Sequence, residues 1–352
     1  MPKNQKEQIA SIPMRIVGPV AIRGTEVNDD VYLPLASFEA PLWPSTERGA
    51  RVATLSGGIK VVIINERMTR SILLEADSAL LLHPILLDIQ KQKDHLQSLV
   101  SKTSRFAKLL DIHSEIIGSL LYLRIELLTG DAAGHNMTTL ASDHIMTWIL
   151  SHYPQLRYVS ISGNYCTDKK VSAVNGILGR GKHVIAEVII SRKICERYLK
   201  TTPEKIVDLN IKKNLLGSIA AGSVRTANAH FANILLGFYL ATGQDAANII
   251  EGSQGIVHAE MRQNDLYFSV SIPNIIVGSV GNGKSLAFVE ENLRLLGCLE
   301  KREPGVNARR LAIIAAAAVL CGELSLLAAQ TKPGELMKSH IKLERKTKRD
   351  HS

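Results

Sequence analysis

The order of apolar segments over residues 71–161 is the feature that most restricts how this chain can fold. Short runs of strand type cover 71–76, 106–116, 120–129 and 157–161, and helical spacing covers 78–102 and 136–152. The order strand, helix, strand, strand, helix, strand is the split βαβ arrangement of ferredoxin-like domains. It predicts a domain of roughly 90 residues. This domain is inserted into the rest of the chain, because the segments on its two sides need each other as partners.

The other residues predict a larger, mainly helical domain, so the expected fold class is α+β. Its two parts, residues 1–70 and 161–352, flank the inserted domain of residues 71–160. Helical spacing covers 45–51, 215–241 and 307–330, whereas strand-type runs cover 59–65, 184–190, 206–210 and 266–276. A chain of 352 residues, 45% of them hydrophobic and 21% charged, has room for two such domains and an ordinary buried core.

The formal net charge of +9 does not select a partner by itself. The tail of residues 341–352 is basic and is expected to be flexible. A ferredoxin-like domain in a basic protein also suggests RNA binding. The strand at 120–129, however, lacks the glycine-aromatic motif that RNA-recognition modules need. We therefore expect no nucleic-acid partner.

Neither a membrane span nor an export signal is expected. The first residues lack the apolar core of a signal peptide. Two apolar stretches, 219–242 and 311–329, contain charged or polar residues and are interpreted as buried helices. The four cysteines share no regular spacing, so neither a disulfide framework nor a metal site is predicted. These features together predict a cytoplasmic protein.

A charged turn follows the inserted domain. From Ser162 to Lys170 it reads Ser-Gly-Asn-Tyr-Cys-Thr-Asp-Lys-Lys, and Gly-Arg-Gly-Lys follows at 179–182. Apolar segments lie on both sides, so the turn is expected to line a cleft. A lysine pair held there suits an anionic substrate or a developing oxyanion. The alternative is a solvated loop, and the turn alone does not decide between the two.

A glycine-rich turn precedes the second helix of the inserted domain. It reads Thr-Gly-Asp-Ala-Ala-Gly-His-Asn-Met over 129–137. Its glycines let the backbone approach a ligand, and the following helix offers free N–H groups to a phosphate. Ser104 and Arg105 add charge and a hydroxyl to the same region, and arginine suits bidentate phosphate contacts. The turn is not a Rossmann fingerprint, and an ordinary tight turn has the same pattern.

Further motifs occur in the order of one known family. They are Asn210-Ile-Lys-Lys-Asn-Leu-Leu-Gly217, Asn228-Ala-His-Phe-Ala-Asn233, Thr242-Gly-Gln-Asp-Ala-Ala247, Gly322-Glu-Leu-Ser-Leu326 and Lys338-Ser-His340. With the two motifs of the charged turn, they cover about residues 30–341. Over this range the chain resembles the catalytic part of class I hydroxymethylglutaryl-CoA (HMG-CoA) reductase.

The resemblance implies an enzyme that reduces the thioester HMG-CoA to mevalonate and free CoA in two hydride steps. It implies that the inserted domain binds NADPH, with NADH as the alternative donor, and that the large domain binds the substrate and its CoA group. Active sites of the family lie between subunits. A homodimer is therefore the expected minimum, and a homotetramer is typical of the class.

Four catalytic residues follow from the resemblance. Lys169 is the cation that stabilises the oxyanion formed as hydride arrives. Glu39 is the acid that protonates the mevaldehyde oxygen, and Asp245 lies beside both residues and tunes them. His340 protonates the departing CoA thiolate, a role that suits an imidazole. Taken singly, each residue also has a structural explanation, such as a helix cap for Asp245.

Binding residues follow in the same way. Those for the substrate are Arg70, Ser162, Asp168, Lys170, Lys213, His230, Asn233 and Ser339. Those for NADPH are Ser104, Arg105, Asp131, Ala133, Gly134, His135, Asn136 and Met137. The resemblance further implies a cis peptide bond between Cys166 and Thr167. No residue is assigned to a metal.

Some segments depart from the family pattern. Residues 6–13 lack the usual segment before the first Gly-Pro, and His135 stands where an apolar residue is usual. Val171 replaces a proline, and Gly281-Asn-Gly-Lys284 replaces Gly-Gly-Gly-Thr. These changes motivate a second hypothesis, a weakened or non-catalytic relative that binds CoA ligands. No predicted catalytic side chain is lost.

Overall fold

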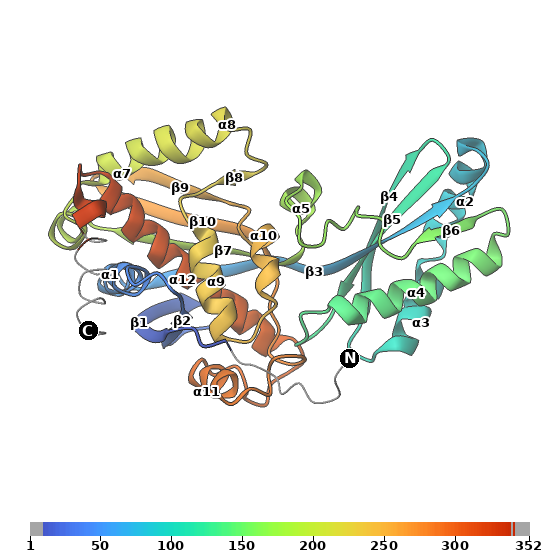
Figure 1. The fold of residues 1–352 in the computed structure, drawn as a ribbon, viewed down its shortest axis with the longest axis horizontal. Helices are drawn as coiled ribbons and strands as arrows, with labels where there is room; N and C mark the ends of the chain where they lie inside the picture. Colours follow the sequence, from blue (N-terminus) through green and yellow to red (C-terminus); the bar gives the residue numbers. More distant parts are fainter. Residues whose placement is uncertain (1–9, 339–340, 342–352) are drawn as a thin grey trace.

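One strand, β3 (Ile59–Glu75), connects the two bodies of the molecule in the computed structural model, which describes residues 10–338 and 341 (Figure 1). Up to Arg67 this strand pairs with β7 (Gly181–Ile190). From Met68 onward it pairs with β5 (Leu120–Leu128). We call residues 68–160 the small body and the other described residues the large body.

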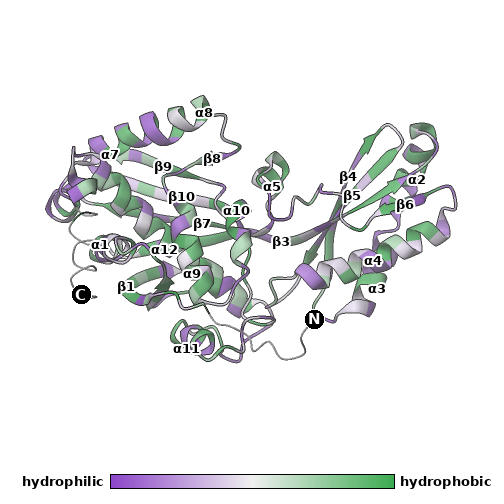
Figure 2. Ribbon diagram, in the orientation of Figure 1, coloured by the Kyte–Doolittle hydropathy of each residue, from purple (hydrophilic) through white to green (hydrophobic). Residues whose placement is uncertain are grey.

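The continuity of β3 corrects the prediction of two separate strands at 59–65 and 71–76. Polar residues interrupt the apolar pattern between the two predicted strands. They fit within the strand because they have ionic partners: Glu66 Oε2 lies 3.7 Å from Lys182 Nζ, and Arg67 Nη1 donates to Glu126 Oε2 at 2.5 Å. Figure 2 shows a hydrophilic stretch in the middle of β3.

The small body has the element order strand, helix, strand, strand, helix, strand, and its sheet is antiparallel in the order β4-β5-β3-β6. The helix predicted over 78–102 is divided in two, because the backbone leaves the helical conformation at Gln92. A hydrophobic core separate from that of the large body lies between sheet and helices. The remaining elements are α2 (Ala79–Lys91), α3 (Lys93–Thr103), β4 (Lys108–Ile117), α4 (His135–His152) and β6 (Arg157–Ser160).

The large body contains a mixed sheet in the order β2-β1-β3-β7-β10-β9-β8. β1 runs parallel to β3, β8 runs parallel to β9, and the other neighbours are antiparallel. The sequence predicted a mainly helical domain that contains some of these strands. It did not predict that the strands form one sheet. The strands not yet bounded are β1 (Met14–Gly24), β2 (Asp30–Ala36), β8 (Thr226–Ala227), β9 (Gly255–Arg262) and β10 (Asp265–Ile275).

Helices pack against this sheet, and α12 (Val306–Gln330) lies on β3, β7 and β10. It packs so closely on α1 (Leu42–Leu55) that a Cβ at Gly49 would lie 1.9 Å from the carbonyl oxygen of Cys321. The other helical segments are α5 (Ala173–Leu178), α6 (Arg192–Ile194), η1 (Cys195–Leu199), α7 (Pro203–Leu209), η2 (Asn210–Gly217), α8 (Ser218–Ala220), α9 (Phe231–Ala241), η3 (Ala246–Asn248), α10 (Ile249–Gly252) and α11 (Ala287–Leu295).

The strand predicted at 206–210 is wrong, because these residues belong to α7 and the start of η2. A short apolar run does not distinguish a strand from a buried helix turn. Pro203 occupies the first turn of α7, where its missing N–H costs no hydrogen bond.

Among the described residues, α12 is the helix long and apolar enough to cross a membrane. Its most apolar 18-residue window is 94% buried inside the protein. Its role here is that of a core helix, as the sequence predicted for residues 311–329.

Candidate active site

Lys169 and Asp245 form an ion pair at the surface of the large body. Lys169 Nζ lies 2.7 Å from Asp245 Oδ2, and each side chain is 41% exposed, so a ligand can reach both. The hydrogen bond to Asp245 raises the pKa of Lys169, which therefore stays cationic at neutral pH. Burial raises the pKa of Asp245, but the ammonium and the Ala247 amide outweigh it and lower the pKa overall. The pair thus presents a fixed cation.

The backbone under Lys169 is held by buried charges. The Lys169 N–H donates to Glu251 Oε1 at 3.1 Å, and Arg180 Nη1 donates to the same oxygen at 2.7 Å. Arg180 Nη2 also lies 2.9 Å from Asp168 Oδ1. The side chains of Arg180 and Glu251 are fully buried. Lys169 has a left-handed backbone with φ of 55°, a strained conformation that these contacts stabilise.

The cis peptide expected between Cys166 and Thr167 is not found. Among the described residues, the cis peptide is the one between Gly18 and Pro19. The turn closes instead through residues with positive φ, namely Asn164, Thr167 and Lys169. The Thr167 N–H donates to the Asn164 carbonyl at 3.0 Å, so the chain reverses direction with a trans bond at this position.

The glycine-rich turn of residues 129–137 lies directly against the charged turn of residues 162–170. His135 Nε2 is 3.9 Å from Asp168 Oδ1 and has no hydrogen-bond partner among the described residues. Burial, with the charge of Arg180, lowers the pKa of His135 to about 4, so its imidazole is neutral at neutral pH. The predicted cofactor loop and the predicted catalytic lysine therefore meet.

Gly134 begins α4 with φ of 97°, and a Cβ there would lie 2.6 Å from the Thr129 side chain. Only glycine fits this position without strain. Within the described part of the chain, no side chain caps α4, so the amides of its first turn have no side-chain partner. A phosphate suits such a helix end, and the residues present fit a dinucleotide.

The other predicted cofactor residues have mixed roles. The Asp131 carboxylate accepts hydrogen bonds from the amides of Gly305 and Ala308, both at 3.0 Å, and so caps α12. It links the turn to the large body instead of facing a ligand. Ser104 ends α3, and the guanidinium of Arg105 lies 4.6 Å from the Phe106 ring centre. Of the remaining three residues, Ala133 is partly buried and Asn136 is exposed. Met137 packs on the core of the small body.

Three predicted substrate residues lie in the charged turn of residues 162–170 or contact it. Arg70 Nη1 donates to Ser162 Oγ at 3.4 Å, which joins β3 to the start of the loop. Lys170 Nζ donates to the Asp168 carbonyl at 3.0 Å. These contacts attach one cationic side chain to the first residue of the turn and a second to the residue before Lys169.

A second group of predicted residues gathers at the N-terminal end of α9. Asn233 Nδ2 donates to Glu39 Oε2 at 3.3 Å. The buried Glu323 accepts hydrogen bonds from the amides of Ala229 (2.9 Å) and His230 (2.5 Å). Burial lowers the pKa of Lys213, and the charge of Glu323 opposes this effect. Glu323 therefore organises the helix end that carries the second group.

Within the described part of one chain, Asp245 pairs with Lys169 but forms no hydrogen bond or ion pair with Glu39. Glu39 contacts Asn233 in the first turn of α9, whereas Asp245 follows the last turn. About 12 Å of helix separates the two positions at about 1.5 Å per residue. The predicted site is thus divided into two groups at opposite ends of α9.

Three charged residues that organise these groups had no predicted site role: Arg180, Glu251 and Glu323. All three side chains are completely buried. Their signal in the sequence is a charge inside an apolar segment, as at Ile249-Ile-Glu251 and in the alanine-rich α12. Ser339 and His340 lie outside the described residues.

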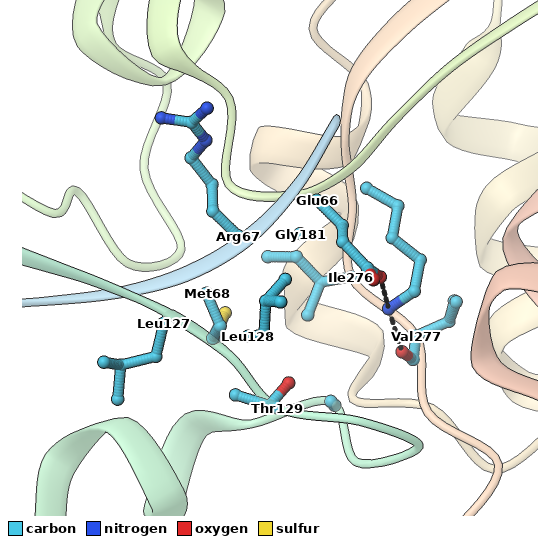
Figure 3. Close-up of a pocket in the computed structure, with 11 residues that line it drawn as sticks. Glu66, Arg67, Met68, Leu127, Leu128, Thr129, Gly181, Ile276 and Val277 are labelled. Atoms are coloured by element: carbon cyan, nitrogen blue, oxygen red, sulfur yellow. Dashed lines mark hydrogen bonds and ion pairs between the residues drawn. The ribbon is translucent and has the colours of Figure 1, made fainter. Parts of the chain in front are cut away.

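A pocket lies between the glycine-rich turn and the large sheet. Figure 3 shows Glu66 and Val277 on either side of a lysine ammonium, which is that of Lys182. Burial lowers the pKa of Lys182, and Glu66 and Asp131 oppose this effect. Thr129 and Ala133 line the same pocket, so a buried cation lies beneath the turn.

The sequence matches the family model of hydroxymethylglutaryl-coenzyme A reductase over residues 9–345. It is 44% identical to the 3-hydroxy-3-methylglutaryl-coenzyme A reductase of Aeropyrum pernix over 95% of this chain and 79% of that protein. It is 46% identical to the reductase of the same name from Pyrococcus horikoshii over 91% of this chain and 78% of that protein. The chain therefore belongs to the hydroxymethylglutaryl-coenzyme A reductase family.

The fold is similar to that of solved reductases. The class II 3-hydroxy-3-methylglutaryl-CoA reductase from Streptococcus pneumoniae, solved with NADPH in open conformations, has a TM-score of 0.73. The two chains are 19% identical, and the match covers 93% of this chain and 77% of the other. At this identity the likeness describes the fold alone.

Proposed function

We propose that this protein reduces 3-hydroxy-3-methylglutaryl-CoA to mevalonate and CoA with NADPH, in two successive hydride transfers. The observation that carries the proposal is the Lys169–Asp245 pair beside the turn of residues 129–137. A cation that is fixed before the reaction stabilises an oxyanion without reorganising during it. Family membership supports the substrate and the donor.

Each predicted site residue has its own role in the reaction. The Lys169 ammonium stabilises the oxyanion on the carbonyl that receives the hydride, and Asp245 holds this ammonium in place. Glu39 protonates the mevaldehyde oxygen, and Asn233 orients its carboxylate. Arg70, Ser162 and Lys170 bind the free carboxylate of the substrate. NADPH supplies the hydride, and the first turn of α4 with Ser104 and Arg105 binds its phosphates.

The functional unit in this proposal is at least a homodimer in the cytoplasm. Support comes from the division of the site, because Glu39 and Lys169 lie at opposite ends of α9 in one chain. A second copy would bring the Glu39 group of one subunit to the Lys169 group of its partner. The small body serves as the cofactor domain and the large body as the substrate domain.

The test of this function is NADPH oxidation, followed by absorbance, with HMG-CoA as substrate. The expected result is two NADPH oxidised for each mevalonate formed. A folded protein with no turnover under either NADPH or NADH would favour the second hypothesis, a non-catalytic relative that binds CoA ligands. The intact Lys169–Asp245 pair makes that hypothesis the weaker one.

Replacing Arg105 with alanine is expected to raise the KM for NADPH about tenfold, because a guanidinium–phosphate contact is a strong charge-assisted bond. The KM for NADH, which lacks the extra phosphate, should stay unchanged. Steady-state kinetics with both donors measure the difference. Lys102→Ala, an exposed base at the end of the same helix α3, is the matched control. An equal effect on both donors would contradict the assignment.

The variant His340→Gln is expected to slow the reduction of HMG-CoA by a factor of 10 or more, because a general acid typically contributes about 10²–10⁴-fold. Reduction of added mevaldehyde should be nearly unchanged, since no thiolate leaves in that step. Rates with the two substrates, measured on the same preparation, check this. Equal loss on both would show that His340 does not protonate the thiolate.

A further inference from the structure

The turn of residues 281–284 packs backbone to backbone against the C-terminal end of α9. A Cβ at Gly243 would lie 2.6 Å from the Gly283 carbonyl oxygen, and one at Gly283 would lie 2.9 Å from the Gly243 carbonyl oxygen. Both glycines have positive φ, 61° and 81°. Two chain segments distant in sequence therefore touch at a point where neither tolerates a side chain.

Lys284 extends this contact with its side chain. Its ammonium donates to the Thr242 carbonyl at 3.1 Å and also to the Gly243 carbonyl. Thr242 is the C-cap of α9 and Gly243 follows it, at a helix end where the dipole is negative and a cation is favourable. Burial lowers the pKa of Lys284 to about 8, so at neutral pH most of this side chain is still an ammonium.

The side chain of Gln244 also connects residues 242–244 to Gly278 by hydrogen bonds. Its Nε2 donates to the carbonyls of Thr242 (2.8 Å) and Gly278 (3.1 Å), and its Oε1 accepts from the Gly278 amide at 2.9 Å. Residues 242–244 are thus fixed to residues 278–284 by side chains of both segments. The next residue is Asp245, which pairs with Lys169.

We infer that Lys284 is a positioning residue for the Lys169–Asp245 pair: its ammonium clamps the end of α9 and so sets where the Asp245 carboxylate stands. The inference rests on the proposed function and deepens it. The ammonium of Lys284 is directed at protein carbonyls, so its effect is on the catalytic step and not on the affinity for CoA or NADPH.

The experiment replaces Lys284 with methionine, which keeps the length and loses the charge. The value of kcat should fall about tenfold with both HMG-CoA and mevaldehyde, because small displacements of catalytic groups have effects of this order. The KM values for NADPH and HMG-CoA should stay within about twofold. Lys284→Arg should recover kcat to within about threefold, since it keeps the cation. Lys301→Met, at an exposed lysine outside the turn, is the control and should resemble the wild type.

A second measurement does not depend on activity. Hydrogen exchange of the amides in residues 242–248 should be at least about tenfold faster in Lys284→Met than in the wild type. Unchanged exchange would overturn the inference, as would a kcat within twofold of the wild type. A raised KM for HMG-CoA at constant kcat would also overturn it, because Lys284 would then bind the ligand. If the wild type has no turnover, the proposed function is contradicted. The hydrogen-exchange measurement then still tests whether Lys284 holds the end of α9 in place.

Discussion

Replacing Lys169 with methionine is expected to reduce turnover about 10³-fold for both HMG-CoA and mevaldehyde, because each hydride step develops an oxyanion that this ammonium stabilises. Loss of one such donor costs roughly 10²–10³-fold in enzymes where it has been removed. Lys169 is a full charge held 2.7 Å from its carboxylate partner, so the upper end of that range applies. Single-turnover oxidation of NADPH measures the chemical step directly.

The fold should survive this substitution. The Lys169 side chain is partly exposed, and the contact of this residue with Glu251 is made by its backbone N–H, which methionine retains. Circular dichroism and the melting temperature should therefore match the wild type. A variant that is unfolded would not test the role of the ammonium, and Lys169→Arg then serves as the replacement, since it keeps the charge but displaces it.

Lys170→Met is the matched control one residue away. Its ammonium contacts the Asp168 carbonyl and not Asp245. In the proposed division of roles it binds the substrate carboxylate, so its loss should raise the KM for HMG-CoA more than it lowers kcat. If both lysine variants lost kcat to the same extent, the separate roles of the two residues would be contradicted.

The small body could be predicted from local patterns, because alternating apolar residues and helical spacing are properties of short segments. The course of β3 could not. A strand that changes partner at Arg67 and Met68 looks like two strands until the ion pairs of its polar residues are known. The strand predicted at 206–210 was wrong for a related reason: a short apolar run fits a strand or a helix, and the structure has the helix α7 over 203–209.

The candidate site was predicted in its residues but not in its geometry. The resemblance to a family assigned Lys169, Asp245 and Glu39, and the structure pairs the first two. The buried Arg180–Glu251 pair under them depends on residues 71 positions apart in the chain. No local pattern encodes such a pairing. Likewise, the length of α9, which keeps Glu39 away from Asp245, becomes visible only in three dimensions.

Another buried ionic cluster lies where the small body meets the linker to β7. The Glu126 carboxylate accepts hydrogen bonds from Arg67 at 2.5 Å and from Arg124, and His113 Nε2 is 3.5 Å away. Arg124 also donates to the Gly179 carbonyl at 2.7 Å, next to Arg180. Both Arg124 and Glu126 are fully buried. Burial lowers the pKa of Arg124, and the charge of Glu126 opposes this effect.

Replacing Glu126 with leucine is expected to lower the free energy of unfolding by about 3–5 kcal/mol, because it leaves the buried Arg124 guanidinium without a counter-charge. Arginine does not lose its proton in proteins, so the charge cannot be relieved by titration. Arg124→Met should cost less, since Glu126 keeps Arg67 and His113 as partners. Urea unfolding of the small body, followed by the fluorescence of Trp148 with Trp43 replaced by phenylalanine, measures both variants.

The double variant Arg124→Met with Glu126→Leu separates the unpaired charge from simple loss of packing. It removes both members of the buried pair, so it should be more stable than Glu126→Leu alone by at least about 1 kcal/mol. Additive losses would mean that each side chain contributes mainly by filling space. Recovery would mean that the cost lies in an isolated charge, and that the junction beside Gly179 tolerates the loss of both charges better than the loss of Glu126 alone.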